Sequence, residues 1–277
     1  MTRVLIVGHG YVGKAYAGLF ERKYQVQIED PGQGLRVHED DKAGADLAVI
    51  CVPTPSGRDG ECDSSLVRQA VKALPKSIRR VMIKSTVAPG TTQEIACENN
   101  RPLVFSPEYV GEGGYHVPPQ FPSPRDPASH GWLILGATWE TEEAPCGMDG
   151  IPIAGEIADL MIPIIGPTTR VRVMAAEDAE MIKYFENSWL ATKVTFVNEM
   201  RRICEAAGAN YHVIREGWLD DPRVGGSHSF AFAQRPGFDG KCLPKDTAAL
   251  EAWCRAAGIP TPLLSAVINA NGGNRGH

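Results

Sequence analysis

The stretch "RVLIVGHGYVGKAYAGLF", residues 3–20, decides the fold of this chain. It opens with the apolar run Arg3–Val7, which is typical of a buried parallel strand. Gly8, Gly10 and Gly13 follow in GxGxxG spacing, and the residues after them have a helical pattern. A strand, a glycine-rich turn and a helix in this order are the context in which the spacing indicates a dinucleotide-binding fold.

The glycines have separate physical roles in such a turn. Gly8 permits the tight turn, Gly10 lets a pyrophosphate approach the backbone, and Gly13 lets the helix and strand pack closely. Tyr11 and Val12 stand at the start of the helix, whose N-terminus then faces the phosphates. We therefore predict dinucleotide binding. The alternative is a glycine turn in an α/β fold that binds no nucleotide.

A carboxylate follows at the expected distance. The next predicted strand, Gln25–Glu29, is followed by Asp30, about 20 residues beyond the glycines, where a carboxylate accepts hydrogen bonds from the ribose hydroxyls. A carboxylate there would repel a 2′-phosphate, so NAD is favoured over NADP. Glu29 is the local alternative for the same role.

Apolar strands alternate with helical segments through the rest of the first half. Such alternation predicts a Rossmann-like parallel sheet that is wound on both sides. The predicted strands are residues 46–53, 79–86 and 102–108, and the predicted helices are 63–74, with Asp63 as N-cap, and one that opens with a capping box at 91–94.

Ligands of such sheets bind at the carboxyl ends of the strands. Pro53-Thr54-Pro55, Ser85-Thr86 and Ser106-Pro107-Glu108 all fall there. Each segment alone has the composition of an ordinary turn, but together, beside the glycine spacing, they favour a binding site. Residues 111–150 are rich in Gly and Pro apart from a predicted strand at "WLILG", which indicates irregular surface connections or a lid over the site.

The second half is predicted to be helical. No Pro or Gly interrupts residues 175–207, and apolar residues cover much of the helix circumference, so we expect a long helix that joins two domains or two subunits. Shorter helices are predicted at 211–218, at 246–257, with Asp246 as a cap, and at 261–271. We accordingly predict an NAD-binding domain over residues 1–174 and a helical domain over residues 175–277.

Two polar residues interrupt the apolar surface of the long helix. Lys183 and Asn187 are four residues apart and so share one face. A lysine among apolar residues is costly unless it is paired or functional. The alternative is a lysine on an exposed stripe of the helix.

Bulk properties exclude several classes of protein. With 28 Lys and Arg against 33 Asp and Glu, the net charge is −5, which argues against a nucleic-acid-binding protein. No apolar run reaches the roughly 18 residues that a membrane span needs. A strand begins almost at once, so we expect no signal peptide. Seven cysteines without a CxxC pair predict reduced thiols in a cytoplasmic protein and no structural metal site.

Seven segments, in order along nearly the whole chain, carry a resemblance to a known family. They are "GHGYVG", "CVPTP", "KSTVAPGTT", "SPEYVGEG", "AEMIKYFENSWLATKVTFVNE", "DPRVG" and "GFDGKCLPKDTAAL". On these motifs the chain resembles the UDP-glucose/GDP-mannose dehydrogenases, which are NAD-dependent nucleotide-sugar 6-dehydrogenases.

The resemblance implies a four-electron oxidation of a sugar primary alcohol to a uronic acid, with two NAD, through a thiohemiacetal and a thioester on Cys242. A thiolate suits this role because it is both a strong nucleophile and a good leaving group. Lys183 and Asn187 are implied to stabilise the oxyanion of each tetrahedral species. Asp246 is implied to orient water or Lys183.

The resemblance also implies roles for residues near the bound molecules. Glu108 and Glu112 are expected near the sugar and the hydrolytic water, and Thr86 is expected to serve both catalysis and cofactor binding. Pro53, Thr54 and Lys245 are expected near NAD. Family members form dimers through the long helix, and the Met, Phe and Trp residues on several faces of 175–207 are compatible with a homodimer.

Three departures from the family pattern stand out. Asp239-Gly240 replaces a pair of glycines before Cys242, which brings a charge near the thiol that Lys241 offsets. The segment "SFAFAQRPGF" differs from the usual substrate loop. The chain also ends where family members continue into a second nucleotide-binding domain. We expect a fragment, a short form whose partner chain supplies that domain, or an enzyme for a different substrate.

Two other functions remain open from the sequence. A two-electron alcohol or hydroxyacid dehydrogenase on the same two-domain plan would need no cysteine. A non-catalytic NAD-binding or assembly subunit would need none of the four residues Lys183, Asn187, Cys242 and Asp246.

Overall fold

The computed structural model describes residues 1–111, 123, 125–139 and 149–275. The chain forms two compact units. The first is drawn from residues 1–183, and the second contains residues 184–275 together with the short segment Ser56–Glu61. The boundary between the units falls inside one long helix, directly after Lys183.

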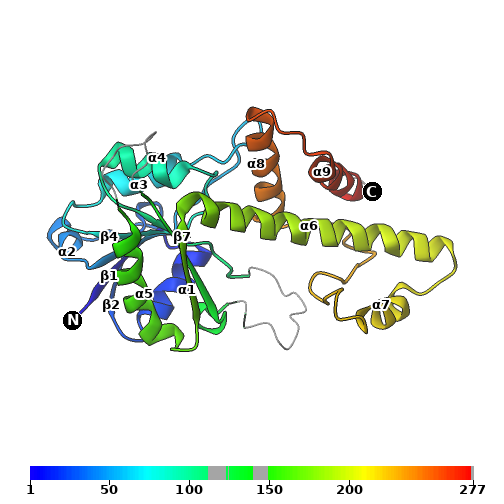
Figure 1. The fold of residues 1–277 in the computed structure, drawn as a ribbon, viewed down its shortest axis with the longest axis horizontal. Coiled ribbons are helices and arrows are strands. Elements are labelled where there is room, and N and C mark those ends of the chain that lie inside the picture. The colour runs from blue at the N-terminus through cyan, green and yellow to red at the C-terminus, as the bar shows by residue number, and fades with distance from the viewer. Residues whose placement is uncertain (112–122, 124, 140–148, 276–277) are drawn as a thin grey trace. The chain divides into compact units, whose positions relative to one another are not determined.

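The first unit is built on a sheet whose described strands have the order β2-β1-β3-β4-β5-β6-β7 (Figure 1). The strands are β1 (Arg3–Val7), β2 (Gln25–Glu29), β3 (Leu47–Ile50), β4 (Arg80–Ile83), β5 (Val104–Phe105), β6 (Trp132–Ala137) and β7 (Arg170–Ala175). Neighbouring strands pair in parallel except β5 and β6, which pair antiparallel. The predicted Rossmann-like sheet is confirmed, with one antiparallel pair that the sequence did not indicate.

Helices cover both faces of this sheet. Because successive residues of a strand point to opposite faces, the strands contribute to two apolar clusters. Alternate residues of β1 pack in one apolar cluster with α1 (Tyr11–Phe20) and α5 (Ile151–Ile165). The residues between them pack in a second cluster with α3 (Ser65–Ala73) and α4 (Thr91–Asn99), on the opposite side of the sheet in Figure 1. Burial on both faces explains the continuous apolar run that predicted a parallel strand.

Several regular elements of the first unit were not predicted. Pro163 lies inside α5, and proline argues against a helix in any reading of local sequence. β7 follows α5 and pairs with β6, so residues 151–175 complete the sheet and its cover. The shorter elements are α2 (Glu39–Ala43) and the 3-10 turns η1 (Pro31–Gln33) and η2 (Pro127–Ser129).

The capping box predicted at 91–94 is wrong. Gly90, which has no side chain, is the N-cap of α4, and the helix has no side-chain cap hydrogen bond at this position. Instead, the carboxyl group of Glu180 accepts hydrogen bonds from the backbone N–H groups of Gly90 (2.6 Å) and Thr92 (2.9 Å) and from the Thr92 hydroxyl. A side chain distant in sequence therefore satisfies the free donors of this helix end.

The cap predicted for the preceding helix is displaced by one residue. Ser64 is the N-cap of α3, and Asp63 lies just before it. Asp63 Oδ1 nevertheless accepts the backbone N–H of Ser65 at 2.8 Å, so its carboxylate still satisfies a donor of the first turn.

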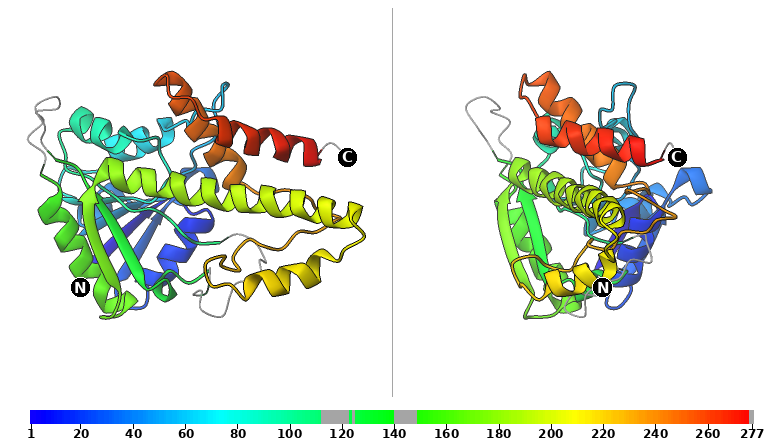
Figure 2. Two further views of the ribbon diagram at one scale, coloured as in Figure 1. Left: turned by 45° about the vertical axis from the view of Figure 1, so that its right-hand side comes forward. Right: turned by 90° about the vertical axis from the view of Figure 1, so that its right-hand side faces the viewer.

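The second unit is helical, as predicted. Its elements are most of α6 (Ala176–Ala206), which matches the helix expected over 175–207, and α7 (Tyr211–Leu219), α8 (Leu243–Ala256) and α9 (Pro262–Arg275) (Figure 2). Ala191 of α6, Leu243 of α8 and Val267 of α9 share a small apolar core. Val197 and Tyr211 form a second core between α6 and α7.

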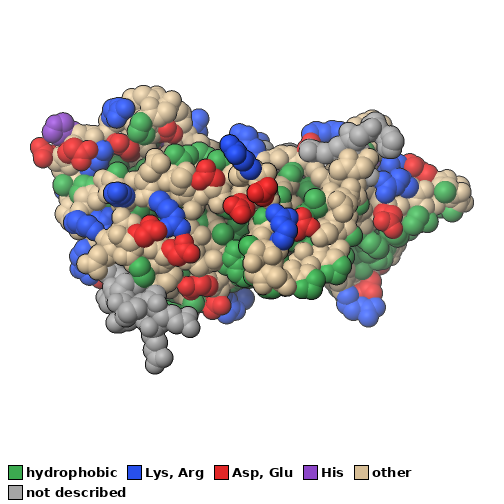
Figure 3. All heavy atoms as spheres, turned by 90° about the horizontal axis from the view of Figure 1, so that it is seen from above, with side chains coloured by type: hydrophobic (Ala, Val, Ile, Leu, Met, Phe, Trp, Pro, Cys, Tyr) green, Lys and Arg blue, Asp and Glu red, His purple; other side chains and the backbone are tan. Residues whose placement is uncertain are grey.

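Acidic and basic side chains lie interspersed on the face shown in Figure 3, without a large patch of one sign. No described helix combines the length and the apolar character that crossing a bilayer requires. Cys97 is disulfide-bonded, so the expectation of reduced thiols is wrong at that position. Free thiols are carried by Cys51, Cys62, Cys204, Cys242 and Cys254.

Candidate active site

The turn between β1 and α1 has the geometry of a phosphate-binding loop. Gly8 has a φ of +92°, and a Cβ there would lie 2.7 Å from the carbonyl oxygen of Cys51. A Cβ on Gly13 would lie 2.0 Å from the carbonyl oxygen of Gly8. Both positions therefore demand glycine. Gly10 has no atom within 4 Å of its Cβ position, so a phosphate has room to approach the backbone at the helix N-terminus.

Asp30 lies beside this turn. Its Oδ2 accepts hydrogen bonds from the backbone N–H of His9 (2.7 Å) and from the side-chain amide of Gln33 (2.8 Å). The hydrogen bond from His9 lowers the pKa of Asp30, so the carboxylate is ionised at neutral pH. Its Oδ1 accepts the backbone N–H of Gln33 at 3.2 Å, so the carboxylate is held in place beside the turn. The residues of the turn and Asp30 thus fit the dinucleotide that the sequence predicts.

Glu29, the alternative carboxylate, is engaged elsewhere. Its Oε2 accepts the backbone N–H of Val37 at 2.9 Å, and its Oε1 forms an ion pair with Lys42 Nζ at 3.0 Å. Asp30, rather than Glu29, is therefore the carboxylate that contacts the glycine-rich turn.

The ends of β3 and β4 come together at the same carboxyl edge of the sheet. Ser85 Oγ donates a hydrogen bond of 2.6 Å to the carbonyl of Val52, which ties the two strand ends together. Beyond β3, Pro53 is exposed and Thr54 is buried. Thr86 is half-buried beyond β4. The structure therefore brings the predicted segments 53–54 and 85–86 to adjacent strand ends.

The segment after β5 is held by a buried lysine. Lys84 Nζ donates hydrogen bonds to the carbonyl of Pro107 (2.8 Å) and to Ser106 Oγ (3.1 Å). Glu108 follows, with only 7% of its surface exposed, and its Oε1 accepts the backbone N–H of Val110. The predicted glutamate is therefore both buried and fixed in position.

Lys183 is the last residue of the first unit. It exposes only 7% of its surface, which contradicts the alternative of a lysine on an exposed stripe. Its Nζ lies 5.4 Å from the centre of the Tyr109 ring, within the range of a cation–π interaction. Glu112, the other predicted glutamate, lies outside the described residues.

In the second unit, Asn187 and Asp246 form a buried pair. Asn187 Nδ2 donates a hydrogen bond of 2.5 Å to Asp246 Oδ2, and the two residues expose 4% and 1% of their surfaces. Lys245 Nζ forms an ion pair with Asp246 Oδ1 at 2.5 Å. The Asp246 carboxylate is thus compensated by an amide and an ammonium group, as a buried charge requires.

Cys242 is the N-cap of α8 and is partly exposed. The positive end of the helix dipole favours a thiolate at such a position. The prediction that Asp246 caps this helix is wrong, because the helix begins at Leu243 and the Asp246 carboxylate binds Asn187 instead. Asp246 still lies one turn from the thiol, since its N–H donates to the Cys242 carbonyl at 2.8 Å.

Asp239, which replaces a family glycine, does not strain the loop before Cys242. Gly237 and Gly240 have the left-handed φ values of +82° and +84°, and Asp239 does not. The Asp239 carboxylate accepts a hydrogen bond of 3.0 Å from Arg235. Arg235 therefore supplies the compensating charge that the sequence assigned to Lys241.

Sequence reasoning missed the residue that anchors this loop. Asn271 of α9 accepts the backbone N–H of Phe238 (2.8 Å) and donates to the Phe238 carbonyl (3.0 Å). Asn271 exposes only 6% of its surface. The two residues are 33 positions apart, so no local pattern marks the pairing.

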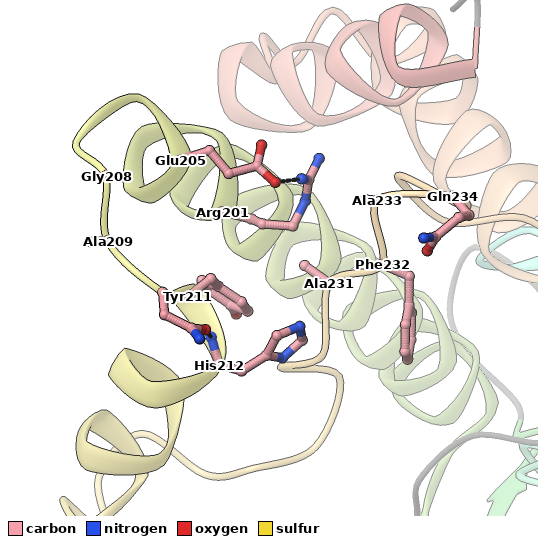
Figure 4. A pocket seen from close by; sticks show the side chains of 11 residues that line it. Arg201, Glu205, Gly208, Ala209, Tyr211, His212, Ala231, Phe232, Ala233 and Gln234 are labelled. Atoms are coloured by element: carbon pink, nitrogen blue, oxygen red, sulfur yellow. Dashed lines mark hydrogen bonds and ion pairs between the residues drawn. The ribbon is translucent and has the colours of Figure 1, made fainter.

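A separate cavity of about 470 Å³ lies where α6 ends and α7 begins (Figure 4). Arg201 and Glu205, which form an ion pair, line it together with Tyr211, His212 and Phe232. Among the residues that the structure describes, none that the sequence singled out as catalytic or cofactor-binding lines this cavity.

The fold and the glycine-rich turn define the class as a Rossmann-type dinucleotide-binding protein with an added helical unit. Two family models specify it further. Residues 20–117 match the NAD binding domain of the UDP-glucose/GDP-mannose dehydrogenase family, and residues 177–272 match its central domain. The chain belongs to the UDP-glucose/GDP-mannose dehydrogenase family.

Individual relatives agree with this assignment. The chain is 32% identical to UDP-glucose 6-dehydrogenase TuaD of Bacillus subtilis over 84% of its own length and 48% of the relative's. It is 29% identical to GDP-mannose 6-dehydrogenase of Azotobacter vinelandii over 97% of this chain and 68% of that protein. The chain spans about half the length of the first curated relatives it matches.

A solved structure shares the fold. The UDP-glucose dehydrogenase of Pyrobaculum islandicum superposes with a TM-score of 0.80 at 24% identity, and the match covers 99% of this chain and 68% of that one. Similarity at this level of identity supports the fold alone.

Proposed function

We propose that this chain carries out the NAD-dependent oxidation of the primary alcohol of a nucleotide sugar to a uronic acid, with Cys242 as covalent nucleophile. The observation that carries the proposal is the buried Asn187–Asp246 pair one turn from Cys242 at the start of α8.

NAD, bound at the glycine-rich turn and Asp30, supplies the hydride acceptor for each of two oxidations. The first oxidation removes a hydride from C6 and a proton from its hydroxyl, which leaves an aldehyde. The Cys242 thiolate adds to C6, and the oxygen takes a proton to give a thiohemiacetal. The second oxidation removes the remaining C6 hydride and the hydroxyl proton and leaves a thioester. Water cleaves the thioester to the acid and restores the thiol.

The chain's polar residues support these steps. We propose that Lys183 and Asn187 donate hydrogen bonds to the oxyanion of each tetrahedral species. Asp246 holds the Asn187 amide in one orientation. Thr86, Glu108 and Glu112 act on the sugar and the hydrolytic water, and Lys245 and Thr54 complete the surroundings of the cofactor.

The stoichiometry of NADH tests the proposal. A panel of nucleotide sugars and free sugars is screened with the wild type and with Cys242→Ser. Two NADH per uronic acid, with the variant stalled before acid release, supports it. One NADH per product and an unaffected variant identify a two-electron dehydrogenase. NAD binding without reduction by any sugar identifies a non-catalytic subunit.

We also propose that the chain forms a homodimer through α6. Phe185, Trp189, Phe196 and Ile203 expose 66%, 60%, 47% and 53% of their surfaces, and their spacing of four, seven and seven residues places them along one side of the helix. Light scattering is expected to give twice the chain mass for the wild type and the single mass for Trp189→Glu. Val213→Glu, at a 68% exposed position on α7, is the control that keeps the dimer.

A further inference from the structure

Lys84 is the most deeply buried lysine among the described residues, with 2% of its surface exposed. Its ammonium group has three interactions. It donates to the Pro107 carbonyl (2.8 Å) and to Ser106 Oγ (3.1 Å), and it lies 4.5 Å from the centre of the Tyr16 ring. Two acceptors and an aromatic face match the three donors of an ammonium group, so each donor of this buried group has a partner.

The segment that Lys84 holds leads directly to two residues of the candidate site. Glu108 follows Pro107, and Tyr109 lies with its ring 5.4 Å from Lys183 Nζ. The Tyr109 ring also has edge-on contacts with His130 (6.1 Å) and Trp132 (5.3 Å), measured between ring centres. The backbone of this segment is thus anchored by Lys84, and the Tyr109 ring contacts the proposed oxyanion lysine.

We propose that Lys84 is a positioning residue for the reaction: its buried ammonium group fixes residues 106–109, so that Glu108 meets the substrate and Tyr109 supports Lys183. This inference rests on the proposed function. Lys84 itself makes no contact with the reacting atoms in this scheme, because its donors are occupied by the segment it holds.

The charges around Lys84 couple it to the same two residues. Burial lowers the pKa of Lys84 to about 7, the Glu108 carboxylate and the Cys51 thiol oppose this change, and Lys183 adds to it. Tyr16 and His130 are the other titratable groups that face it, and burial together with the Lys84 charge lowers the pKa of His130 to about 4. Glu108 therefore favours the charged form of Lys84 near neutral pH, and Lys183 disfavours it.

The kinetic test uses Lys84→Met, which keeps the volume and removes the charge and the donors. We expect kcat to fall roughly 10- to 100-fold, as for loss of hydrogen bonds to a charged group, while the KM for NAD changes less than about threefold. Met82→Val is the matched control, because Met82 lies two residues earlier on β4, is fully buried and has an apolar side chain. A lower melting temperature with wild-type kcat in both variants would overturn the proposal.

A second readout does not depend on activity. In NMR titrations of protein with ¹³C-labelled lysine, the resonance that Lys84→Met removes is expected to titrate near pH 7. Glu108→Gln should lower this pKa and Lys183→Met should raise it. If the Lys84 resonance has the same pKa in the wild type, in Glu108→Gln and in Lys183→Met, the coupling is overturned. This outcome is informative even if no sugar reduces NAD and the proposed function fails.

Ser106→Ala covers the case in which Lys84→Met does not fold. It removes one of the three contacts of the ammonium group and leaves the charge in place. We expect a smaller loss, on the order of three- to tenfold in kcat, consistent with one hydrogen bond. An unchanged kcat in this variant would count against the positioning role.

Discussion

Asn187 of α6 and Asp246 of α8 are joined by a hydrogen bond of 2.5 Å between two almost fully buried side chains. The sequence predicted both residues, with Asp246 as a helix cap and, from the family resemblance, as a group that orients water or Lys183. Neither expectation paired it with Asn187. The observed pairing instead directs the amide and the carboxylate at each other beside the Cys242 turn.

Asn187→Ala is expected to abolish most activity and to lower stability. The Asp246 carboxylate would remain buried with one partner fewer, which costs about 1–3 kcal/mol of the free energy of unfolding. The loss of a proposed oxyanion donor should lower kcat by roughly 100-fold or more. Thermal unfolding and steady-state NAD reduction measure the two effects.

Asn198→Ala is the matched control for this variant. Asn198 lies on the same helix, is 1% exposed, and donates to the Val194 carbonyl at 2.8 Å. We expect a comparable loss of stability with normal kcat. If both variants lose activity in proportion to their stability, Asn187 has no role beyond structure.

Asp30→Asn should weaken NAD binding by about tenfold or more, because a charge-assisted hydrogen bond to the ribose becomes a neutral one. The preference for NAD over NADP should also narrow, since the repulsion of a 2′-phosphate is removed. Isothermal titration with both dinucleotides measures these changes. Glu29→Gln, which alters only the contacts with Val37 and Lys42, should leave the preference unchanged.

The pH dependence of Asp30 has a defined sign. Its folded pKa is lowered, first by the hydrogen bond from His9, so its contribution to stability is present above the ordinary value of 3.8. That contribution is lost as the pH falls through the lower folded pKa. The stability difference between the wild type and Asp30→Asn should therefore be constant near neutral pH and shrink in acid. A difference that grows in acid would contradict this sign.

Glu180 changes the stability with pH in the opposite direction to Asp30. Burial raises its pKa from 4.5 to about 8, despite the donors of Gly90 and Thr92. Between these values the folded state binds more protons than the unfolded state, so this carboxyl lowers stability as the pH rises. Denaturant unfolding of the wild type from pH 5 to 8 should show this decline, and Glu180→Gln should remove that part of it. Equal slopes for the two proteins would show that the carboxylate is ionised throughout.

The fold was predictable where local chemistry leaves few choices, as at Gly8 and Gly13, where any Cβ would collide with backbone. The ambiguity between Glu29 and Asp30 was not resolvable from sequence, because adjacent carboxylates differ only in the direction their side chains take. The capping pattern at 91–94 failed for a similar reason. The local pattern predicted that side chains of 91–94 cap α4. The donors at the start of α4 are bound instead by Glu180 of α6, and a partner so distant in sequence leaves no local signal.

Asn271→Ala offers a last test, on a residue that no pattern marked. Its amide occupies both backbone groups of Phe238, four residues before Cys242, so the variant leaves a buried donor and a buried acceptor unpaired. We expect a loss of about 1–3 kcal/mol in unfolding free energy and faster amide exchange in residues 237–242. Because the loop positions Cys242, the rate of thiol alkylation should also change, while NAD affinity stays constant. Unchanged exchange in this loop would show that α8, rather than Asn271, fixes the nucleophile.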